Sequence, residues 1–401
     1  MSIGEGILVP RGFRAAATKA GIKPSGGLDL AVLAADGPCV AAGTYTTNRV
    51  CAAPVRWDRA RTPSEQVRAI VVNAGNANAA TGATGDANAR RTATLAADQL
   101  GCRADEVLIA STGVIGHQLP MDKIEAGLKT VVHSLSADES AFADVSSAIL
   151  TTDSRPKLVS MRESIGGAAV TLLGLAKGAA MIGPRMATML GFLLTDAAVR
   201  PGDLQAILSD AVERSFNCIS VEGHTSTNDT VLLLAGGAPR GETPLAGNDL
   251  ERFAALVRSA CIALARMIPD DGEGATHRIT IDVEGCRDRD EARAIARAVA
   301  DSPLVKTAIH GADPNWGRIV SAAGYSGVSF EEADLSLFLN GAALYHKGAP
   351  VPFDAVAVSE GIRRERDVHV RLVFTLGGAS VRFWTCDLSA EYVRLNADYT
   401  T

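Results

Sequence analysis

The middle of the chain reads Lys177-Gly-Ala-Ala-Met-Ile-Gly-Pro-Arg-Met-Ala-Thr188-Met-Leu190. Apolar runs of strand length flank this stretch, at Ala168–Leu175 and at Thr188–Thr195. Two glycines and a proline interrupt the stretch, so we expect a loop between two strands rather than one continuous strand. Apart from one lysine, one arginine and one threonine the loop is apolar. Such a loop is expected to be buried or to form part of a site.

Strand-length and helix-length segments alternate on both sides of this loop. The other predicted strands are apolar runs at Ala69–Asn73, Val107–Ile109, Thr230–Ala235, Ile279–Val283, Leu335–Leu339, Val368–Leu376 and Val381–Cys386. The predicted helices are amphipathic segments at Asp86–Leu100, Met121–Leu135, Glu139–Leu150, Asp203–Ser215, Asp249–Met267 and Asp290–Ala300. This mixture predicts an α/β (α+β) protein built in layers. Gly377 and Gly378 separate the last two strands, which predicts a β-hairpin.

Composition narrows the class of protein. The chain of 401 residues is expected to form two or three domains, and 47% hydrophobic with 21% charged residues is a globular composition. The net charge of -6 and the lack of a long basic run argue against a nucleic-acid partner. We expect no signal peptide and no membrane helix, because no uncharged apolar run is long enough. Seven cysteines without a Cys-x-x-Cys pair predict reduced thiols and a cytoplasmic protein.

Thr188 is the candidate nucleophile of the central loop. A threonine hydroxyl is a weak nucleophile and needs an adjacent base. If the bond between Ala187 and Thr188 were cut, the new α-amine, with a pKa of about 7.7–8.0, would be neutral enough near pH 7 to serve as that base. The residues alone leave a second interpretation open, in which Thr188 is an ordinary β-branched residue at the start of a strand.

Seven motifs outside the central loop occur along the chain: Thr46-Thr-Asn-Arg-Val50, Asn73-Ala-Gly-Asn-Ala-Asn78, Ser111-Thr-Gly-Val-Ile-Gly116, Thr225-Ser-Thr-Asn-Asp-Thr230, Asp271-Gly-Glu-Gly-Ala-Thr276, Asp313-Pro-Asn-Trp-Gly-Arg318 and Asn396-Ala-Asp-Tyr-Thr-Thr401. With the loop at 177–190, in this order and at these separations, they resemble the ornithine acetyltransferases, also called glutamate N-acetyltransferases. The resemblance covers nearly the whole chain.

The resemblance implies that the chain cuts itself between Ala187 and Thr188. It implies an α fragment, 1–187, with the oxyanion and substrate-clamp residues, and a β fragment, 188–401, with a smaller C-terminal α/β domain from about residue 280 to 401. The family fold is a layered sandwich of sheets and helices. Thr188 is expected to take acetyl from N-acetylornithine and to pass it to glutamate in a ping-pong reaction of arginine biosynthesis. Two α and two β fragments are expected to form a heterotetramer. No cofactor is implied, and acetyl-CoA as a second donor is left open.

An oxyanion site is expected at Thr112 and Gly113, directly after the predicted strand Val107–Ile109. Acyl transfer passes through a tetrahedral intermediate whose oxyanion is stabilised by preorganised donors. The hydroxyl of Thr112 and the backbone N–H of Gly113 are suitable donors, and glycine lets the backbone approach a ligand closely. From the residues alone, the same segment also fits a turn or helix N-cap before Met121.

The resemblance assigns substrate binding to Thr188 and to residues before and after it, namely Thr151, Lys177, Glu273, Asn396 and Thr401. Lys177 is expected to bind a carboxylate or to support the reacting centre. The alternative interpretation is a solvated lysine at the end of a strand. Glu273 lies in a glycine-bounded loop, where a carboxylate would select the ammonium of ornithine; a surface turn is the alternative. Of the two neighbouring threonines, Thr151 rather than Thr152 is taken as the substrate-binding residue. The alternative is that Thr151 simply ends the preceding helix.

The C-terminus is expected to line the site through Asn396 and Thr401, because chain ends usually fray unless something holds them. Amide and hydroxyl groups can bind both the carboxylate and the ammonium of an amino acid. The alternative is a helix from Ser389 that packs on the core and then ends.

Several residues depart from the family pattern: Ala180, Arg185, Glu222, His224 and His277. Arg185 lies three residues before the candidate nucleophile in the sequence. Its presence there leaves open both the rate of self-cleavage and the selection of the substrate side chain. Some relatives act in clavulanic acid clusters, which leaves the pathway open. No histidine or cysteine spacing fits a metal site. Two further functions remain open: an amide hydrolase or aminopeptidase with the same nucleophile, and an uncleaved paralogue that only binds amino acids.

Overall fold

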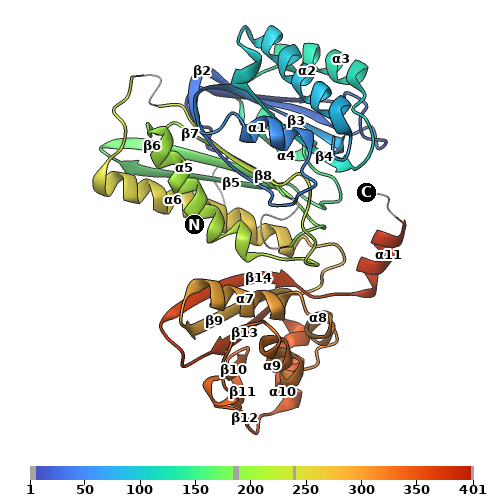
Figure 1. The fold of residues 1–401 in the computed structure, drawn as a ribbon, viewed down its shortest axis with the longest axis vertical. Helices are drawn as coiled ribbons and strands as arrows, with labels where there is room; N and C mark the ends of the chain where they lie inside the picture. Colours follow the sequence, from blue (N-terminus) through green and yellow to red (C-terminus); the bar gives the residue numbers. More distant parts are fainter. Residues whose placement is uncertain (1–5, 184–188, 238–240, 399–401) are drawn as a thin grey trace.

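The computed structural model describes residues 6–183, 189–237 and 241–398, and two sheets organise them (Figure 1). The first sheet has eight strands in the order β4-β3-β2-β8-β7-β6-β5, with β1 paired to β2. Its strands are β1 Phe13–Thr18, β2 Leu30–Tyr45, β3 Ser64–Asn76, β4 Val107–Val114, β5 Lys157–Ile165, β6 Ala168–Lys177, β7 Leu190–Thr195 and β8 Thr230–Ala235.

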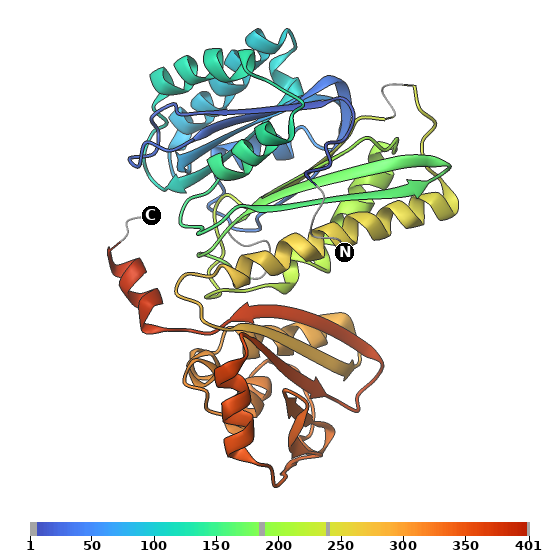
Figure 2. The same cartoon turned by 180° about the vertical axis from the view of Figure 1, so that it is seen from behind.

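Strand β2 is long and belongs to both halves of the first sheet. Its first part pairs with β1 and β3, and its last part, Val40–Tyr45, pairs with β8. The register with β3 shifts twice between Ala34 and Ala41. Irregularities of this kind bend a strand and increase its twist. The two halves of the sheet therefore face each other, with the N-terminal strands in blue and β5 and β6 in green (Figure 2).

An apolar core fills the space between the two halves. Side chains alternate along β7, so that Leu190, Phe192 and Leu194 join this core while Met189 and Leu193 join the core on the opposite face. A strand that is buried on both faces must be apolar throughout, which explains its continuous apolar sequence. The facing half contributes buried side chains of the same kind, namely Phe13, Leu33, Ile70, Val72 and Leu108.

Helices cover the outer face of each half. One outer layer consists of α2 Gly82–Leu100 and α3 Met121–His133, with α1 Ala53–Arg59 beside β4. The other consists of α5 Pro201–Glu213 and α6 Gly247–Asp270, while α4 Glu139–Ala148 packs against β1 and β2. This helix–sheet–sheet–helix arrangement confirms the predicted layered α/β fold class.

The second sheet has six strands in the order β12-β11-β10-β13-β9-β14. Its strands are β9 Arg278–Cys286, β10 Ser336–Leu339, β11 Ala342–His346, β12 Ala349–Pro350, β13 Asp367–Val373 and β14 Ala379–Cys386. Its helices are α7 Arg289–Ala300, α8 Pro303–His310, α9 Trp316–Gly324 and α10 Ala355–Arg364. These strands and helices form the smaller C-terminal α/β domain that was predicted as part of the fold.

The predicted hairpin between the last two strands is wrong. Strand β9 lies between them, parallel to β13 and antiparallel to β14. The connection crosses the end of β9, where the backbone N–H groups of Leu376 and Gly377 donate to the carbonyl of Gly285. A side chain at Gly377 would collide with the backbone of Cys286. The glycine therefore serves a close crossing of chains rather than a tight turn.

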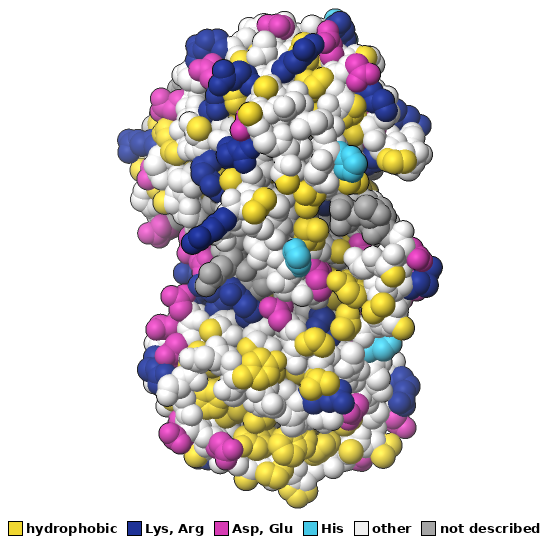
Figure 3. Space-filling view, turned by 45° about the vertical axis from the view of Figure 1, so that its right-hand side comes forward, with side chains coloured by type: hydrophobic (Ala, Val, Ile, Leu, Met, Phe, Trp, Pro, Cys, Tyr) yellow, Lys and Arg dark blue, Asp and Glu magenta, His cyan; other side chains and the backbone are white. Residues whose placement is uncertain are grey.

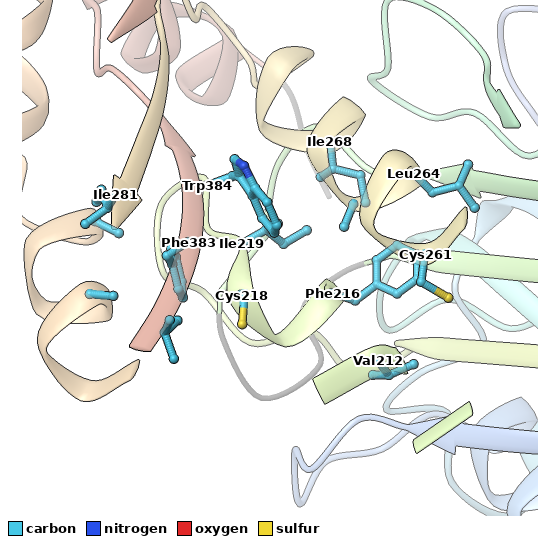
Figure 4. Packing of buried hydrophobic residues seen from close by; sticks show 14 of the residues in the cluster. Val212, Phe216, Cys218, Ile219, Cys261, Leu264, Ile268, Ile281, Phe383 and Trp384 are labelled. Atoms are coloured by element: carbon cyan, nitrogen blue, oxygen red, sulfur yellow. The ribbon is translucent and has the colours of Figure 1, made fainter. Parts of the chain in front are cut away.

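The two sheets share one continuous core. Trp384 of β14 lies beside Ile219, as Figure 4 shows, and both belong to one buried cluster with Ile268 of α6 and Ile281 of β9. Ile219 also forms an isolated bridge with Trp384. After β14 the chain returns towards the first sheet and ends in α11 Ala390–Asp398, which lies beside the junction of the two sheets (Figures 1 and 2). The second sheet thus places the C-terminal helix near the ends of β4 and β6.

The surface and the cysteines agree with the composition. Figure 3 shows acidic and basic side chains interspersed over one face. In the described parts of the chain, no helix is long and apolar enough to cross a membrane. Five of the seven cysteines are buried, namely Cys39, Cys218, Cys261, Cys286 and Cys386.

Candidate active site

A cavity between the two layers gathers every predicted site residue that the structure describes. Its lining includes Thr112, Gly113, Thr151, Lys177, Glu273 and Asn396. Its empty volume is about 620 Å³, including the open space at its mouth. The predicted residues Ala187, Thr188 and Thr401 lie outside the described residues. Strand β7 begins directly after that gap and pairs with β6, which ends at Lys177.

Thr112 and Gly113 lie near the end of β4, where β4 runs parallel to β3. Gly113 has a φ of 128°, and a side chain there would collide with the backbone of Gly75. Only glycine fits this close approach. The side-chain amide of Asn228 donates to the carbonyl of Ser111 at 2.8 Å and to that of Ala77 at 2.6 Å. The backbone before Thr112 is therefore fixed, as an oxyanion site requires.

Lys177 is buried rather than solvated, with 2% of its surface exposed. Its Nζ donates to Oγ1 of Thr112 at 3.0 Å. A hydroxyl that accepts this bond can still donate its own proton, and a positive partner strengthens that donation. Burial lowers the pKa of Lys177, while the charge of Asp153 acts in the opposite direction. This geometry favours the role of supporting the reacting centre over that of a solvated lysine.

A buried ion network holds the loops of the cavity together. Lys157, which is fully buried, donates to Asp153 at 2.7 Å and to Asp271 at 2.6 Å. Asp153 also accepts the backbone N–H groups of Gly178 at 2.6 Å and Thr151 at 3.2 Å. Burial alone would raise the pKa of Asp153, but the charges of Lys177 and Lys157 hold it below the ordinary value. One network therefore positions the backbone at Thr151, the end of β6 and the loop that carries Glu273.

The C-terminal helix reaches the cavity through Asn396. Its amide donates to Oε2 of Glu273 at 2.7 Å. Ser389 donates to the carbonyl of Gly274 at 2.7 Å, which fastens the start of the segment to the same loop. The predicted alternative is half correct: α11 is a helix, but none of its described residues is buried, so it does not pack on the core.

Comparisons with known proteins identify the family. The ArgJ family model matches residues 14–401. The chain belongs to the ArgJ family. The arginine biosynthesis bifunctional protein ArgJ of Rhodopirellula baltica is 43% identical over 396 residues, covering 98% of this chain and 97% of that protein. The protein of the same name from Symbiobacterium thermophilum is 45% identical over 399 residues, covering 99% and 98%.

Among solved structures, the ornithine acetyltransferase of Mycobacterium tuberculosis complexed with ornithine is 41% identical. It covers 46% of this chain and 96% of its own, with a TM-score of 0.43. As a member of the ArgJ family, the chain is an acetyltransferase of arginine biosynthesis.

The ArgJ cavity also contains residues to which the sequence analysis gave no role. Thr152, Ser226, Thr227 and Asn228 line it, and the last three belong to the polar motif that precedes β8. The signal that could have indicated Ser226, Thr227 and Asn228 is a polar run. This run stands directly before a buried strand that neighbours the predicted strand Thr188–Thr195. The ion network had no such signal, because its members become neighbours only in the folded chain.

The residues that depart from the family pattern differ in burial and in their position relative to the cavity of this ArgJ chain. Ala180 lines the cavity. Glu222 is half-buried with both carboxyl oxygens enclosed, and this burial raises its pKa to about 8. His277 bonds the carbonyl of Ile362 at 3.0 Å and lies against Asp387, away from the cavity lining. His224 is exposed, and Arg185 lies outside the described residues.

A truncated chain that ends at Leu395 should fold and cleave, but its KM for both amino-acid substrates should rise. Loss of one hydrogen bond to a charged group costs about 1.5–3 kcal/mol, which corresponds to roughly 10- to 100-fold in affinity. Initial rates over a range of each substrate measure the change. The matched control is Arg394→Ala, because among the described residues this side chain pairs with Glu391 on the exposed part of the same helix. Unchanged kinetics of the truncated chain would remove Asn396 and Thr401 from the site.

Proposed function

We propose that the protein is a self-cleaving acetyltransferase that moves acetyl from N2-acetyl-L-ornithine to L-glutamate through an acetyl-Thr188 intermediate. The products are L-ornithine and N-acetylglutamate, as steps of arginine biosynthesis. The observation that carries the proposal is the buried contact from Lys177 to Thr112 in a cavity beside the strand that follows Thr188. Self-cleavage would give the fragments 1–187 and 188–401.

The reaction follows from the roles of the residues. The α-amine of Thr188, freed by cleavage, takes the hydroxyl proton as Oγ1 attacks the acetyl carbonyl. The hydroxyl of Thr112, polarised by Lys177, and the N–H of Gly113 stabilise the oxyanion. Collapse of the intermediate expels ornithine, whose nitrogen receives the proton. Glutamate then attacks the acetyl ester by the same steps in reverse.

The polar lining supports recognition of an amino acid. Glu273 supplies a carboxylate for the ammonium of ornithine, and the amide of Asn396 orients that carboxylate from the other side. Thr151 and Lys177 also line the cavity and add hydrogen-bond donors to it. Thr401 is proposed as a further contact on the basis of the family motif alone.

The partners and location form part of the same proposal. The two fragments stay together and assemble as a heterotetramer of two α and two β in the cytoplasm. The fragments already share a core, because β6 pairs with β7 across the proposed cleavage position. The transfer between two amines needs no cofactor, and an assay with acetyl-CoA and glutamate alone would show whether acetyl-CoA serves as a second donor.

Ping-pong kinetics test the proposal. One nucleophile must hold the acetyl group between two amines that occupy the site in turn. Initial-rate plots with N-acetylornithine and glutamate varied together should therefore give parallel lines. Intersecting lines would indicate that both substrates bind at once and would count against the acyl-enzyme. Acetate released at the same rate without glutamate would indicate a hydrolase instead.

A further inference from the structure

The buried lysine that contacts the oxyanion donor can polarise that donor only while it is charged. Lys177 donates to Oγ1 of Thr112 at 3.0 Å, and burial lowers its pKa. A buried ammonium without a compensating charge tends to release its proton rather than stay charged. The neutral amine would lack the positive charge that strengthens the donation from Thr112. Resting on the proposed function, we ask which residue keeps this charge in place.

Asp153 is a fixed and ionised carboxylate next to the end of β6. Its side chain is fully enclosed. Its Oδ1 accepts the backbone N–H of Gly178, the residue directly after Lys177, at 2.6 Å, and the ammonium of Lys157 at 2.7 Å. Its Oδ2 accepts the backbone N–H of Thr151 at 3.2 Å. Both oxygens act as acceptors, as they do in an ionised carboxylate. The negative charge of Asp153 is therefore held in one place by three donors.

Asp153 is also the strongest of the negative charges that act on Lys177. The carboxyl groups of Asp229 and Glu273 favour the charged lysine as well, but each acts less strongly than Asp153. Burial raises the pKa of Asp229 well above the ordinary carboxyl value, which weakens it as a counterion. Glu273 is the carboxylate that the proposed function gives to the ammonium of ornithine. Asp153 remains as the counterion that belongs to the protein itself.

The positive charges nearby act in the opposite direction on Lys177. Lys157 is fully buried, and its Nζ lies between Asp153 and Asp271, 2.6 Å from Oδ2 of the latter. Its position is fixed by β5, where it pairs with Ala176 of β6. The charge of Lys157 disfavours a second ammonium at Lys177. Lys23 is a further ammonium that interacts with Asp153 and Lys177, and it donates to two backbone carbonyls at 2.8 Å.

We propose that Asp153 is a positioning residue of acetyl transfer, which keeps Lys177 charged beside the hydroxyl of Thr112. Asp153 does not line the cavity, so it acts on the oxyanion through Lys177 rather than by touching the substrate. Its bond to the N–H of Gly178 holds the end of β6, and its charge balances the ammonium that the same strand end carries. Lys157 opposes this effect, because it shares the carboxylate of Asp153.

The test uses two substitutions with opposite expected effects on the pH dependence of kcat. Asp153→Asn keeps the side-chain shape and one oxygen acceptor but removes the negative charge. Without that charge Lys177 loses its proton at lower pH, so the alkaline limb of kcat should move to lower pH by about 1–3 units, the effect of one nearby opposite charge. Lys157→Met removes a competing positive charge, so the limb should move to higher pH. Rates of ornithine release are measured at saturating N-acetylornithine and glutamate.

The matched control is Asp196→Asn. Asp196 is also buried, and its Oδ1 accepts the backbone N–H of Thr171 at 2.8 Å, but it lies outside the cavity lining and near the other end of β6. This variant should keep the alkaline limb of the wild type. A shift of equal size in Asp196→Asn would indicate a general effect of removing a buried carboxylate and would overturn the role of Asp153.

The outcomes separate this inference from the proposed function. A wild type that releases no ornithine from N-acetylornithine overturns the proposed function. An active wild type whose alkaline limb coincides with that of Asp153→Asn overturns only the role of Asp153, even if the variant has a lower kcat at every pH. If Asp153→Asn gives no cooperative thermal transition, Lys157→Met decides. A limb that stays in place or moves to lower pH in Lys157→Met would contradict the inference.

Discussion

A Thr188→Ala variant should remain one full-length chain and transfer no acetyl group. The substitution removes both the nucleophile of self-cleavage and the atom that carries acetyl between substrates. Denaturing gels and a coupled assay for released ornithine measure the two losses separately. The loss of acetyl transfer is expected to be complete, because the proposed acyl intermediate forms on the Thr188 hydroxyl.

The matched control for this variant is Thr195→Ala, on the strand that follows the nucleophile. Thr195 is fully buried, and its hydroxyl donates to the carbonyl of Thr171 at 2.8 Å, outside the cavity lining. Its loss should cost about 0.5–1.5 kcal/mol of stability and leave cleavage intact. A Thr188→Ala chain that still cleaves would assign the nucleophile to another residue.

Thr112→Ala should lower kcat by roughly 10²–10³, the usual loss for one oxyanion donor. The hydroxyl is the acceptor of the buried Lys177 ammonium, so its removal also leaves that charge without the contact. The KM should change little, since the oxyanion forms in the tetrahedral intermediate and the transition states beside it and is absent from the bound substrate. Steady-state rates of a folded, cleaved sample give both constants.

Thr92→Ala is the control for this prediction. Thr92 is buried, but its hydroxyl bonds the carbonyl of Asn88 within α2, away from the cavity. Its kcat should equal that of the wild type. If Thr112→Ala also keeps the wild-type kcat, then Thr112 is only a turn residue and the oxyanion must be stabilised elsewhere.

The fold class could be predicted from the sequence, but the path of β2 could not. Strand β8 matches its predicted range, Thr230–Ala235, because its apolar run is uninterrupted. Strand β2 carries Asp36-Gly-Pro38 in its middle, a combination typical of a turn. The structure keeps this segment extended as an irregular bend, where proline is tolerated within a sheet. Tertiary pairing on both sides of the bend overrides the local turn signal.

The candidate site could be predicted only where the chain has a local pattern. The motif around Thr112 and Gly113 predicted a backbone that approaches a ligand. In the structure Gly113 closely approaches the backbone of Gly75 and Asn76, and its contact with a ligand stays a prediction. The contact from Asn396 to Glu273 joins residues far apart in the sequence, so no spacing rule could indicate it. For the same reason the burial of Lys157 between Asp153 and Asp271 follows only from the fold.

Intact-mass measurement of the purified protein mixed with N-acetylornithine tests the central claim most directly. The account predicts two fragments, 1–187 and 188–401, with one acetyl group added to the second fragment only. Glutamate added afterwards should remove that acetyl group, and the Thr188→Ala chain should show neither cleavage nor acetylation. A single full-length mass from a wild-type sample that still produces N-acetylglutamate, or an acetyl group on the first fragment, would contradict it.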